Sequence, residues 1–197
     1  MLPVKWTSRE KVRDLARANP GWRFYDVSTN APLANIEGII DAHEFSPFMA
    51  YGDIPIPGTT QKSDSVEGVW QGLKIIDGKT DSSHFKGKGR KRLGNVEGHQ
   101  YGKKVLPYVL ARQKIYVPTY EFMLEERVPR EKLDEILELA QEGVQQYFFD
   151  VDSNPDIHDK RSPLSHASVL VGFINAVLNR QRILEEVPQV DYSRAPV

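Results

Sequence analysis

Three polar side chains that could do chemistry recur at helical spacing in the segment SDSVEGVWQGLK, residues 63–74. Glu67, Gln71 and Lys74 stand at positions i, i+4 and i+7, so an α-helix brings them onto one face as a narrow polar stripe. A carboxylate can stabilise a developing positive charge or take up a proton, and a desolvated lysine can attack carbon to form an imine. Glu67 and Lys74 are about 10 Å apart along such a helix, too far for a tight ion pair but close enough to flank one substrate group.

The same stripe also has an ordinary structural interpretation. Asp64 is a candidate N-cap, and Glu67 then falls at the N3 position of a capping box. Gln71 and Lys74 would be flank residues beside the apolar arc of the helix. That arc consists of Val66, Val69, Trp70, Leu73 and Ile76. Spacing alone favours the structural interpretation, so the neighbouring motifs must decide whether the stripe lines a pocket.

A basic, glycine-containing segment, FKGKGRKR, follows at residues 85–92. Its cations are Lys86, Lys88, Arg90, Lys91 and Arg92. Cations on a loop that approaches a ligand closely can bind phosphate or a nucleic-acid backbone, although such a run is also typical of a solvated surface loop. The segment is neither a Walker A loop nor a complete G-x-G-x-x-G fingerprint.

An acidic segment, DVDSNPDIHDKRSPLSH, lies at residues 150–166. Its alternating Asp150, Asp152, Asn154 and Asp156 resemble a calcium loop, but the glycine at position 6 and the closing glutamate of an EF-hand are missing. The five histidines include no H-E-x-x-H pattern and there is no cysteine. We therefore expect no metal and no cofactor.

The order of these motifs resembles that of the NADAR (YbiA-like) family. The segment FSPF at residues 45–48 precedes the E-x₃-Q-x₂-K block, Gly89-Arg90 follows it, and the acidic segment leads into a last apolar helix. The family pattern has His at position 68, Asn at position 47 and a W-G pair in the late loop, where this chain has Gly68, Pro47 and no such pair. The chain thus resembles a divergent member.

The resemblance implies an N-glycosidase that hydrolyses the ribose C–N bond of ADP-ribosylated guanine in DNA or RNA, as in toxin or phage-defence counteraction. It implies ADP-ribose or ADP-ribosylated nucleic acid as the partner. One alternative is an N-glycosidase acting on a phosphoribosylated metabolite of the riboflavin-pathway type. A non-catalytic ADP-ribose or nucleotide binder, or a structural protein that keeps only the fold, also stays open.

The resemblance also assigns residues to roles. It makes Glu67 and Lys74 catalytic, and a ribose-binding role falls to Gln71 between them. The other expected substrate-binding residues are Phe45, Ser46, Phe48, Gly89, Arg90, Asp152 and Asn154. Phe45 and Phe48 offer aromatic faces to a base, whereas Trp70 is expected in the core, and Tyr116 or Arg112 could reach the cleft.

Composition places these motifs in an ordinary globular chain of 197 residues with a net charge of −1, 40% hydrophobic and 27% charged residues. No leader-type apolar segment and no run of 18 apolar residues occurs, so a cytoplasmic protein without a membrane partner is expected. We expect an α+β fold: a predominantly helical, NADAR-like single domain with a few short strands. Residues 1–40 would be an N-terminal extension, 41–180 the core and 187–197 a loose tail.

Apolar periodicity and breakers predict the elements of this domain. Helices are expected at residues 9–19, 66–76, 107–126 with a kink or restart at Pro118, 130–144, and 164–186. Ser162 and Pro163 would cap and open the last helix. Strands are expected at residues 22–28 and 147–151, both rich in aromatic residues.

Overall fold

The computed structural model describes residues 4–186 of the chain, with side chains up to residue 182. These residues form a single domain in which helices and short strands combine, as predicted, but the main sheet is parallel and flanked by helices, so the fold is α/β and not the expected, predominantly helical α+β class. The expectation of a loose tail at 187–197 lies outside the described residues. Within the described part of the chain, no helix has both the length and the apolar character that crossing a membrane requires.

The strands are all short and the helices are distributed along the whole chain. The strands are β1 Val4–Trp6, β2 Arg23–Asp26, β3 Ile39–Asp41, β4 Ile54–Pro55, β5 Lys62–Ser63, β6 Lys74–Ile75, β7 Gly98–Tyr101, β8 Lys104–Leu106 and β9 Gln146–Phe149. The α-helices are α1 Arg9–Ala18, α2 Val66–Leu73, α3 Tyr108–Ala111, α4 Val117–Glu126, α5 Arg130–Gln141 and α6 His166–Glu186. A π-helical segment, Arg112–Tyr116, joins α3 to α4, and 3₁₀ turns lie at His43–Phe45 and Ser82–Phe85.

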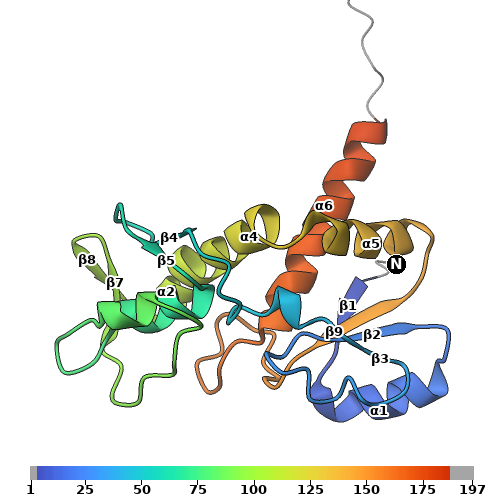
Figure 1. Cartoon of the computed structure of the whole chain (residues 1–197), viewed down its shortest axis with the longest axis horizontal. Coiled ribbons are helices and arrows are strands. Elements are labelled where there is room, and N and C mark those ends of the chain that lie inside the picture. The colour runs from blue at the N-terminus through green and yellow to red at the C-terminus, as the bar shows by residue number, and fades with distance from the viewer. Residues whose placement is uncertain (1–3, 187–197) are drawn as a thin grey trace, which may run out of the picture.

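One half of the molecule is a four-stranded, fully parallel sheet in the order β1-β9-β2-β3. Successive residues of a strand point to opposite faces, so Phe148 of β9 packs in the cluster that contains residues of α5 and α6, whereas Phe149 packs with Val12 of α1. Both faces are covered, as a parallel sheet requires, with α1 on one side and α5 and α6 on the other (Figure 1). The N-terminal segment supplies β1, β2 and most of β3 to this sheet.

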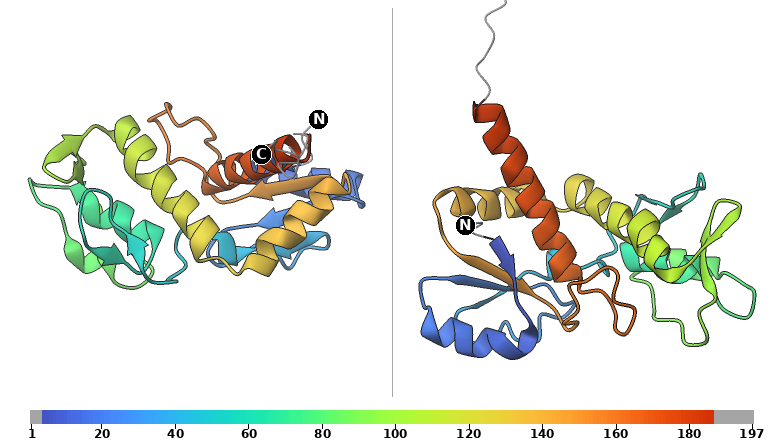
Figure 2. Two further views of the ribbon diagram at one scale, coloured as in Figure 1. Left: turned by 90° about the horizontal axis from the view of Figure 1, so that it is seen from above. Right: turned by 180° about the vertical axis from the view of Figure 1, so that it is seen from behind.

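The other half is built around α2. A two-stranded sheet, β4-β5, and a three-stranded antiparallel sheet, β6-β7-β8, surround this short helix. The continuous helical rod made of α3, the π segment and α4 runs beside α2 and reaches back toward α6 (Figure 2). Every residue of α2 is buried, which explains why an eight-residue helix is stable here: tertiary packing supports it.

The boundaries of α2 differ from the prediction at both ends. Ser65, not Asp64, is the N-cap, and its side chain accepts a hydrogen bond from the N–H of Gly68 at 3.0 Å. Asp64 instead accepts a hydrogen bond from the N–H of Gly87. The helix ends at Leu73 because Lys74 adopts an extended backbone and pairs with His99 of β7.

The predicted restart at Pro118 is confirmed, since the π segment ends at Tyr116 and α4 begins at Val117 with Pro118 in its first turn, where its missing N–H costs least. One further helix prediction is corrected. The last helix begins at His166, two residues after the predicted start at residue 164. Ser165 caps it, with its Oγ accepting from the N–H of Ser168 at 3.3 Å, whereas Ser162 and Pro163 belong to the preceding loop.

Candidate active site

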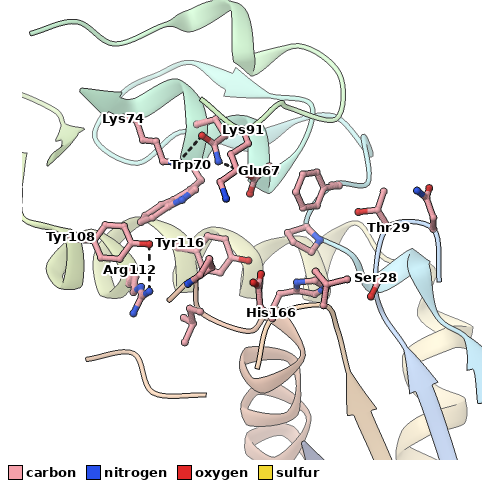
Figure 3. Close-up of a pocket in the computed structure, with 18 of the residues that line it drawn as sticks. Ser28, Thr29, Glu67, Trp70, Lys74, Lys91, Tyr108, Arg112, Tyr116 and His166 are labelled. Atoms are coloured by element: carbon pink, nitrogen blue, oxygen red, sulfur yellow. Dashed lines mark hydrogen bonds between the residues drawn. The ribbon is translucent and has the colours of Figure 1, made fainter. Parts of the chain in front are cut away.

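A cavity of about 480 Å³ lies between α2 and the carboxyl ends of strands β2 and β9. Its volume is in the range of small-molecule sites. The carboxyl edge of a parallel sheet is the usual place for a ligand in α/β proteins. Figure 3 shows Glu67, Trp70, Lys74 and Lys91 on one side of this cavity, facing residues of the helical rod and His166 on the other.

The predicted polar stripe lines this cavity as a hydrogen-bonded chain. Gln71 donates from Nε2 to Oε1 of Glu67 at 2.5 Å, and Lys74 donates from Nζ to Oε1 of Gln71 at 2.7 Å. The amide of Gln71 thus links the two groups that helical rise keeps apart. All three side chains are buried, with exposed fractions of 8% for Glu67, 3% for Gln71 and 7% for Lys74.

The capping-box interpretation of Glu67 is wrong. With Ser65 as N-cap, Glu67 occupies the N2 position and Gly68 the N3 position, so no glutamate stands where a capping box needs one. The Glu67 carboxylate is bonded to Gln71 instead. A negative charge in the first turn of α2 is favoured by the helix dipole, so Glu67 keeps that general role at the helix start without being part of a capping box.

Burial shifts both end groups of the chain toward their neutral forms. It raises the pKa of Glu67, against the opposing effects of the Gln71 hydrogen bond and the Lys74 charge. It lowers the pKa of Lys74, helped by Lys91 and Arg92 and opposed by Glu67. Both shifts are toward the states that the chemistry would use, a protonated acid at Glu67 and an unprotonated amine at Lys74.

A buried ion pair closes the side of the cavity next to the sheet. His166 lies 2.9 Å from Oδ2 of Asp150 through Nδ1 and 2.9 Å from the carbonyl oxygen of Val27 through Nε2. Both partners are acceptors, so both ring nitrogens carry protons and His166 is an imidazolium. Burial alone lowers the pKa of His166, but the Asp150 carboxylate and these hydrogen bonds raise it above its ordinary value.

Asp150 and Asp152 of the acidic loop have different surroundings, one in the protein interior and one at the cavity. Asp150 is fully buried and accepts hydrogen bonds from Ser165 and from the N–H of Ala167, which anchors the start of α6. Asp152 lines the cavity and is half-buried. Burial and the neighbouring Asp150 charge raise the pKa of Asp152, and it is the predicted member of this loop that reaches the site.

Aromatic side chains form much of the remaining wall. Trp70 lines the cavity while only 8% exposed, so the expectation that it serves the core is only part of its role. One face of its indole stacks on His99 at a centroid distance of 3.8 Å, and Tyr116 meets it edge-on at 5.5 Å. The hydroxyl of Tyr116 has no partner among the described residues, and Figure 3 shows it directed into the cavity.

The lysine and arginine side chains of the basic segment differ in their location and contacts. Lys91 and Arg90 are both exposed, but only Lys91 is among the residues that line the cavity. Arg92 donates to the carbonyl oxygens of Gln71 and Lys74, which fixes the end of α2. The structure therefore places Lys91, not the predicted Arg90, at the cavity lined by Glu67, Gln71 and Lys74.

Arg112 lines the cavity, but its guanidinium is hydrogen-bonded to backbone carbonyl oxygens of the protein. Its guanidinium donates to the carbonyl oxygens of Ile157, Asp159 and Ser162, at 2.7 to 3.0 Å. These bonds hold the acidic loop against the helical rod. We assign Arg112 to positioning this wall, not to binding an anion.

Four other predicted binding residues lie outside the cavity lining. Phe45 is in the hydrophobic core, and its carbonyl oxygen accepts a hydrogen bond from Tyr120. Ser46 is fully buried, and its Oγ accepts from the N–H of Phe48, which does line the cavity. Asn154 is buried and donates to two carbonyl oxygens of its own loop. A Cβ at Gly89 would lie 2.7 Å from the backbone nitrogen of Gly68, so this glycine allows the basic loop to pack on α2.

Sequence reasoning missed the contribution of the segment that follows β2. Ser28, Thr29 and Asn30 line the cavity, although residues 1–40 were expected to be an extension outside the core. His166 was also missed as a site residue, because its role depends on Asp150 and Val27. An available signal was the aromatic strand ending in a polar STN triplet, which is the pattern of a ligand-binding loop at the carboxyl end of a parallel strand.

One group of three potential metal ligands occurs among the described residues. Ligand atoms of Asp41, His43 and Glu44 lie within 4.8 Å of one another, outside the residues that line the cavity. His43 is paired with Asp41 at 2.7 Å and Glu44 with Lys132 at 3.5 Å, so existing contacts account for this cluster.

Comparison with known proteins gives a match to a protein family, and it spans most of this fold. No curated protein and no solved structure matched the chain. Residues 7–170 match the family described as "Family of unknown function (DUF6939)", and the matched part includes α2, β2, β9 and the start of α6, which together build the cavity. The match spans more than four fifths of the chain. The chain therefore belongs to the family of unknown function DUF6939.

Proposed function

We propose that this protein is an N-glycosidase that hydrolyses the ribose C–N bond of ADP-ribosylated guanine in nucleic acid. One observation carries the proposal: Glu67, Gln71 and Lys74 form a buried hydrogen-bonded chain along the wall of a polar cavity. A structural protein gains nothing from burying an acid and an amine whose pKa values are displaced toward neutrality.

Lys74 is the nucleophile in this proposal. Its neutral Nζ forms a bond to the anomeric carbon while the bond from that carbon to the guanine nitrogen breaks. The electron pair goes to guanine, which takes a proton from the Glu67 carboxyl group. The new ammonium returns one proton to the Glu67 carboxylate. The bond from the anomeric carbon to the ring oxygen then breaks, and that oxygen takes the second amine proton, which leaves an imine between Nζ and the opened ribose. Water then adds to the imine carbon, and cleavage of the bond to Nζ releases ADP-ribose and restores Lys74.

The other charged residues support the same centre. The Asp152 carboxylate can accept ribose hydroxyls and stabilise positive charge at the anomeric carbon. The Lys91 ammonium, which lines the cavity, offers a partner for phosphate. Tyr116 stays a hydrogen-bond donor, because burial and the Glu67 charge raise the pKa of its hydroxyl well above the usual value.

The resemblance to NADAR proteins supports this choice of substrate, and packing gives a reason for one departure. A Cβ at Gly68 would lie 2.6 Å from the carbonyl oxygen of His84 and 2.6 Å from Oγ of Ser63. The 3₁₀ turn at Ser82–Phe85 thus occupies the space that a histidine at position 68 would need. Glu67, Gln71 and Lys74 keep the spacing of the E-x₃-Q-x₂-K block despite this change.

Release of ADP-ribose from a guanine-containing oligonucleotide tests the proposal. The wild-type protein should release ADP-ribose, whereas Glu67→Gln and Lys74→Ala should each lose at least about 100-fold in rate. Arg130→Ala is a matched control, because Arg130 contacts Asp134 on the exposed face of α5 and should leave the rate unchanged. Tight ADP-ribose binding without release would contradict an enzyme and favour a binder. Release from a phosphoribosylated small molecule alone would contradict the nucleic-acid substrate.

A further inference from the structure

One end of the cavity is lined by uncharged side chains, although His166 borders it through Val27 and Glu67 borders it through its backbone bond to Pro47. This end is formed by the segment after β2 and by the FSPF segment, and its lining residues are Ser28, Thr29, Asn30, Pro32, Pro47 and Phe48. All charged lining residues come from other segments: they are Glu67, Lys74, Lys91, Arg112, Asp152 and His166. Figure 3 shows Ser28 and Thr29 together at one side, away from Lys74 and Arg112.

The hydroxyl of Ser28 is an unsatisfied polar group at this wall. Ser28 is 4% exposed, and its Oγ has no hydrogen-bond partner among the described residues. Buried hydroxyls are nearly always hydrogen-bonded, so an orphan beside a cavity indicates a partner that enters the cavity. Because no bond holds its side-chain torsion, Oγ can turn toward a ligand without losing a contact.

The backbone that carries Ser28 is held in place from two sides. The fully buried carboxylate of Asp26 accepts hydrogen bonds from the N–H of Ser28 at 3.1 Å and of Leu33 at 2.9 Å. His166 donates to the carbonyl oxygen of Val27. The left-handed backbone at Ala31, with φ of 37°, closes the turn between these anchors. Such a preorganised loop is what binding requires and a solvated connection does not.

The chemistry of this end fits a neutral heteroaromatic ring. Phe48 is half-buried and presents an aromatic side chain, and two prolines add apolar surface beside it. Hydroxyl and amide groups of Ser28, Thr29 and Asn30 can both donate and accept, as the edge of a nucleobase demands. A phosphate would find no cation among these residues, and both ring nitrogens of the neighbouring His166 are already bonded, to Asp150 and to Val27.

We propose that the Ser28–Phe48 end of the cavity is a nucleobase subsite that holds the guanine leaving group. The assignment rests on the proposed function in taking the base next to the scissile bond as the occupant. A guanine inside a polynucleotide would have to leave its stack to enter, and Phe48 supplies the replacement stacking surface. The charged part of the cavity is then left to the ribose and the phosphates.

Binding of guanosine, compared with ribose 5-phosphate, tests this subsite without requiring turnover. Calorimetric titration should show that Ser28→Ala weakens guanosine about 3- to 10-fold and Phe48→Ala about 5- to 100-fold, with ribose 5-phosphate unchanged. Ser28→Ala removes a group that has no protein partner, so thermal stability should not fall. Thr119→Val is the matched control, since Thr119 is also buried with an unpartnered hydroxyl but does not line the cavity.

Each other outcome has a definite meaning. The subsite assignment is overturned if wild type does not bind guanosine, or if both variants bind guanosine as tightly as wild type does. It is also overturned if adenosine binds wild type as tightly as guanosine does and is weakened equally by the two substitutions. Equal weakening of ribose 5-phosphate would also overturn it. Guanosine binding that depends on Ser28 and Phe48, in a protein that releases no ADP-ribose, would support the subsite while rejecting the proposed function. Release of ADP-ribose with kinetics unchanged in both variants would do the reverse.

Discussion

At the scale of single side chains, the cavity separates hydroxyls that hold the fold from hydroxyls that face the ligand. Tyr120 donates to the carbonyl oxygen of Phe45 at 2.6 Å and is fully buried. Tyr116, one turn earlier on the same rod, has no partner for its hydroxyl among the described residues and borders the cavity. The two tyrosines therefore form a natural pair of probes.

We predict that Tyr116→Phe lowers activity but not stability, and that Tyr120→Phe lowers stability. Tyr116→Phe should leave the melting temperature nearly unchanged and lower kcat/KM about 10-fold or more, because only a substrate contact is lost. Tyr120→Phe should lower the free energy of unfolding by about 1–3 kcal/mol, since the carbonyl oxygen of Phe45 loses its buried donor. Thermal unfolding and steady-state kinetics on both variants measure this. A stability loss confined to Tyr116→Phe would contradict the assignment.

The ionisation of Glu67 gives a second prediction at this scale. Burial raises its pKa above the ordinary 4.5, so the stability that this group contributes is full below that pH and falls as the pH rises toward the folded-state pKa. Glu67→Gln cannot ionise. Its free energy of unfolding, relative to wild type, should therefore increase between about pH 4 and about pH 7. Urea denaturation across this range checks the sign, and a difference that stays constant or decreases would show that Glu67 ionises without cost.

At the scale of elements, α2 depends on its N-cap as well as on packing. Ser65 accepts from the N–H of Gly68 and donates to the carbonyl oxygen of Gly87, so it joins the helix start to the basic loop. Ser65→Ala should lower the free energy of unfolding by about 1–2 kcal/mol, or the melting temperature by a few degrees. Ser83→Ala, at an exposed serine bonded to Asp81, should change it much less. Equal effects in both variants would argue against the cap.

Local patterns predicted the helices and the strands β2 and β9, but they missed the other short strands and the contacts that complete the elements. The stripe of α2 and the apolar face of α5 follow from spacing alone, and both are found. The end of α2 was missed because Lys74 joins a strand through a partner, His99, that is far along the chain. The cap was missed because Asp64 and Ser65 are both capping residues and only the tertiary fold chooses between them.

In the candidate site, too, some residues are placed by their spacing along the chain and others by the tertiary fold. Glu67 and Gln71 lie on α2 and Lys74 directly follows its last residue, so their alignment could be predicted from residue spacing. Ser28 and His166 reach the cavity only because β2 and β9 are adjacent in the sheet and end at the same edge. Arg90 and Asn154 were matched by motif position, but position along a loop does not determine which side chain faces the ligand.

At the scale of the whole molecule, positive charge is concentrated in the half built around α2. Residues 84–106 contain seven lysines or arginines and one glutamate, although the chain as a whole has a net charge of −1. Lys88 and Arg90 in this segment are exposed. The helix α1, which carries exposed Lys11 and Arg13, lies at the opposite end of the molecule (Figure 1). A nucleic-acid carrier would therefore meet the α2 half.

We predict that the basic segment contributes a salt-dependent part of oligonucleotide binding. The double variant Lys88→Ala, Arg90→Ala should bind duplex DNA more weakly and reduce the slope of log K against log salt by about 2. Lys11→Ala with Arg13→Ala is the charge-matched control and should leave the slope unchanged. Fluorescence anisotropy at several salt concentrations measures both. Equal slopes in the two double variants would mean that the carrier does not contact this segment.

The central claim is that Lys74 attacks the ribose carbon, and trapping of the imine tests it most directly. The protein is incubated with an ADP-ribosylated guanine oligonucleotide in the presence of borohydride, digested, and mapped by mass spectrometry. We expect a reduced ADP-ribose adduct on the peptide that contains Lys74, and no adduct on any peptide of Lys74→Ala. Release of ADP-ribose by Lys74→Ala at the wild-type rate, with no adduct in either protein, would contradict the account.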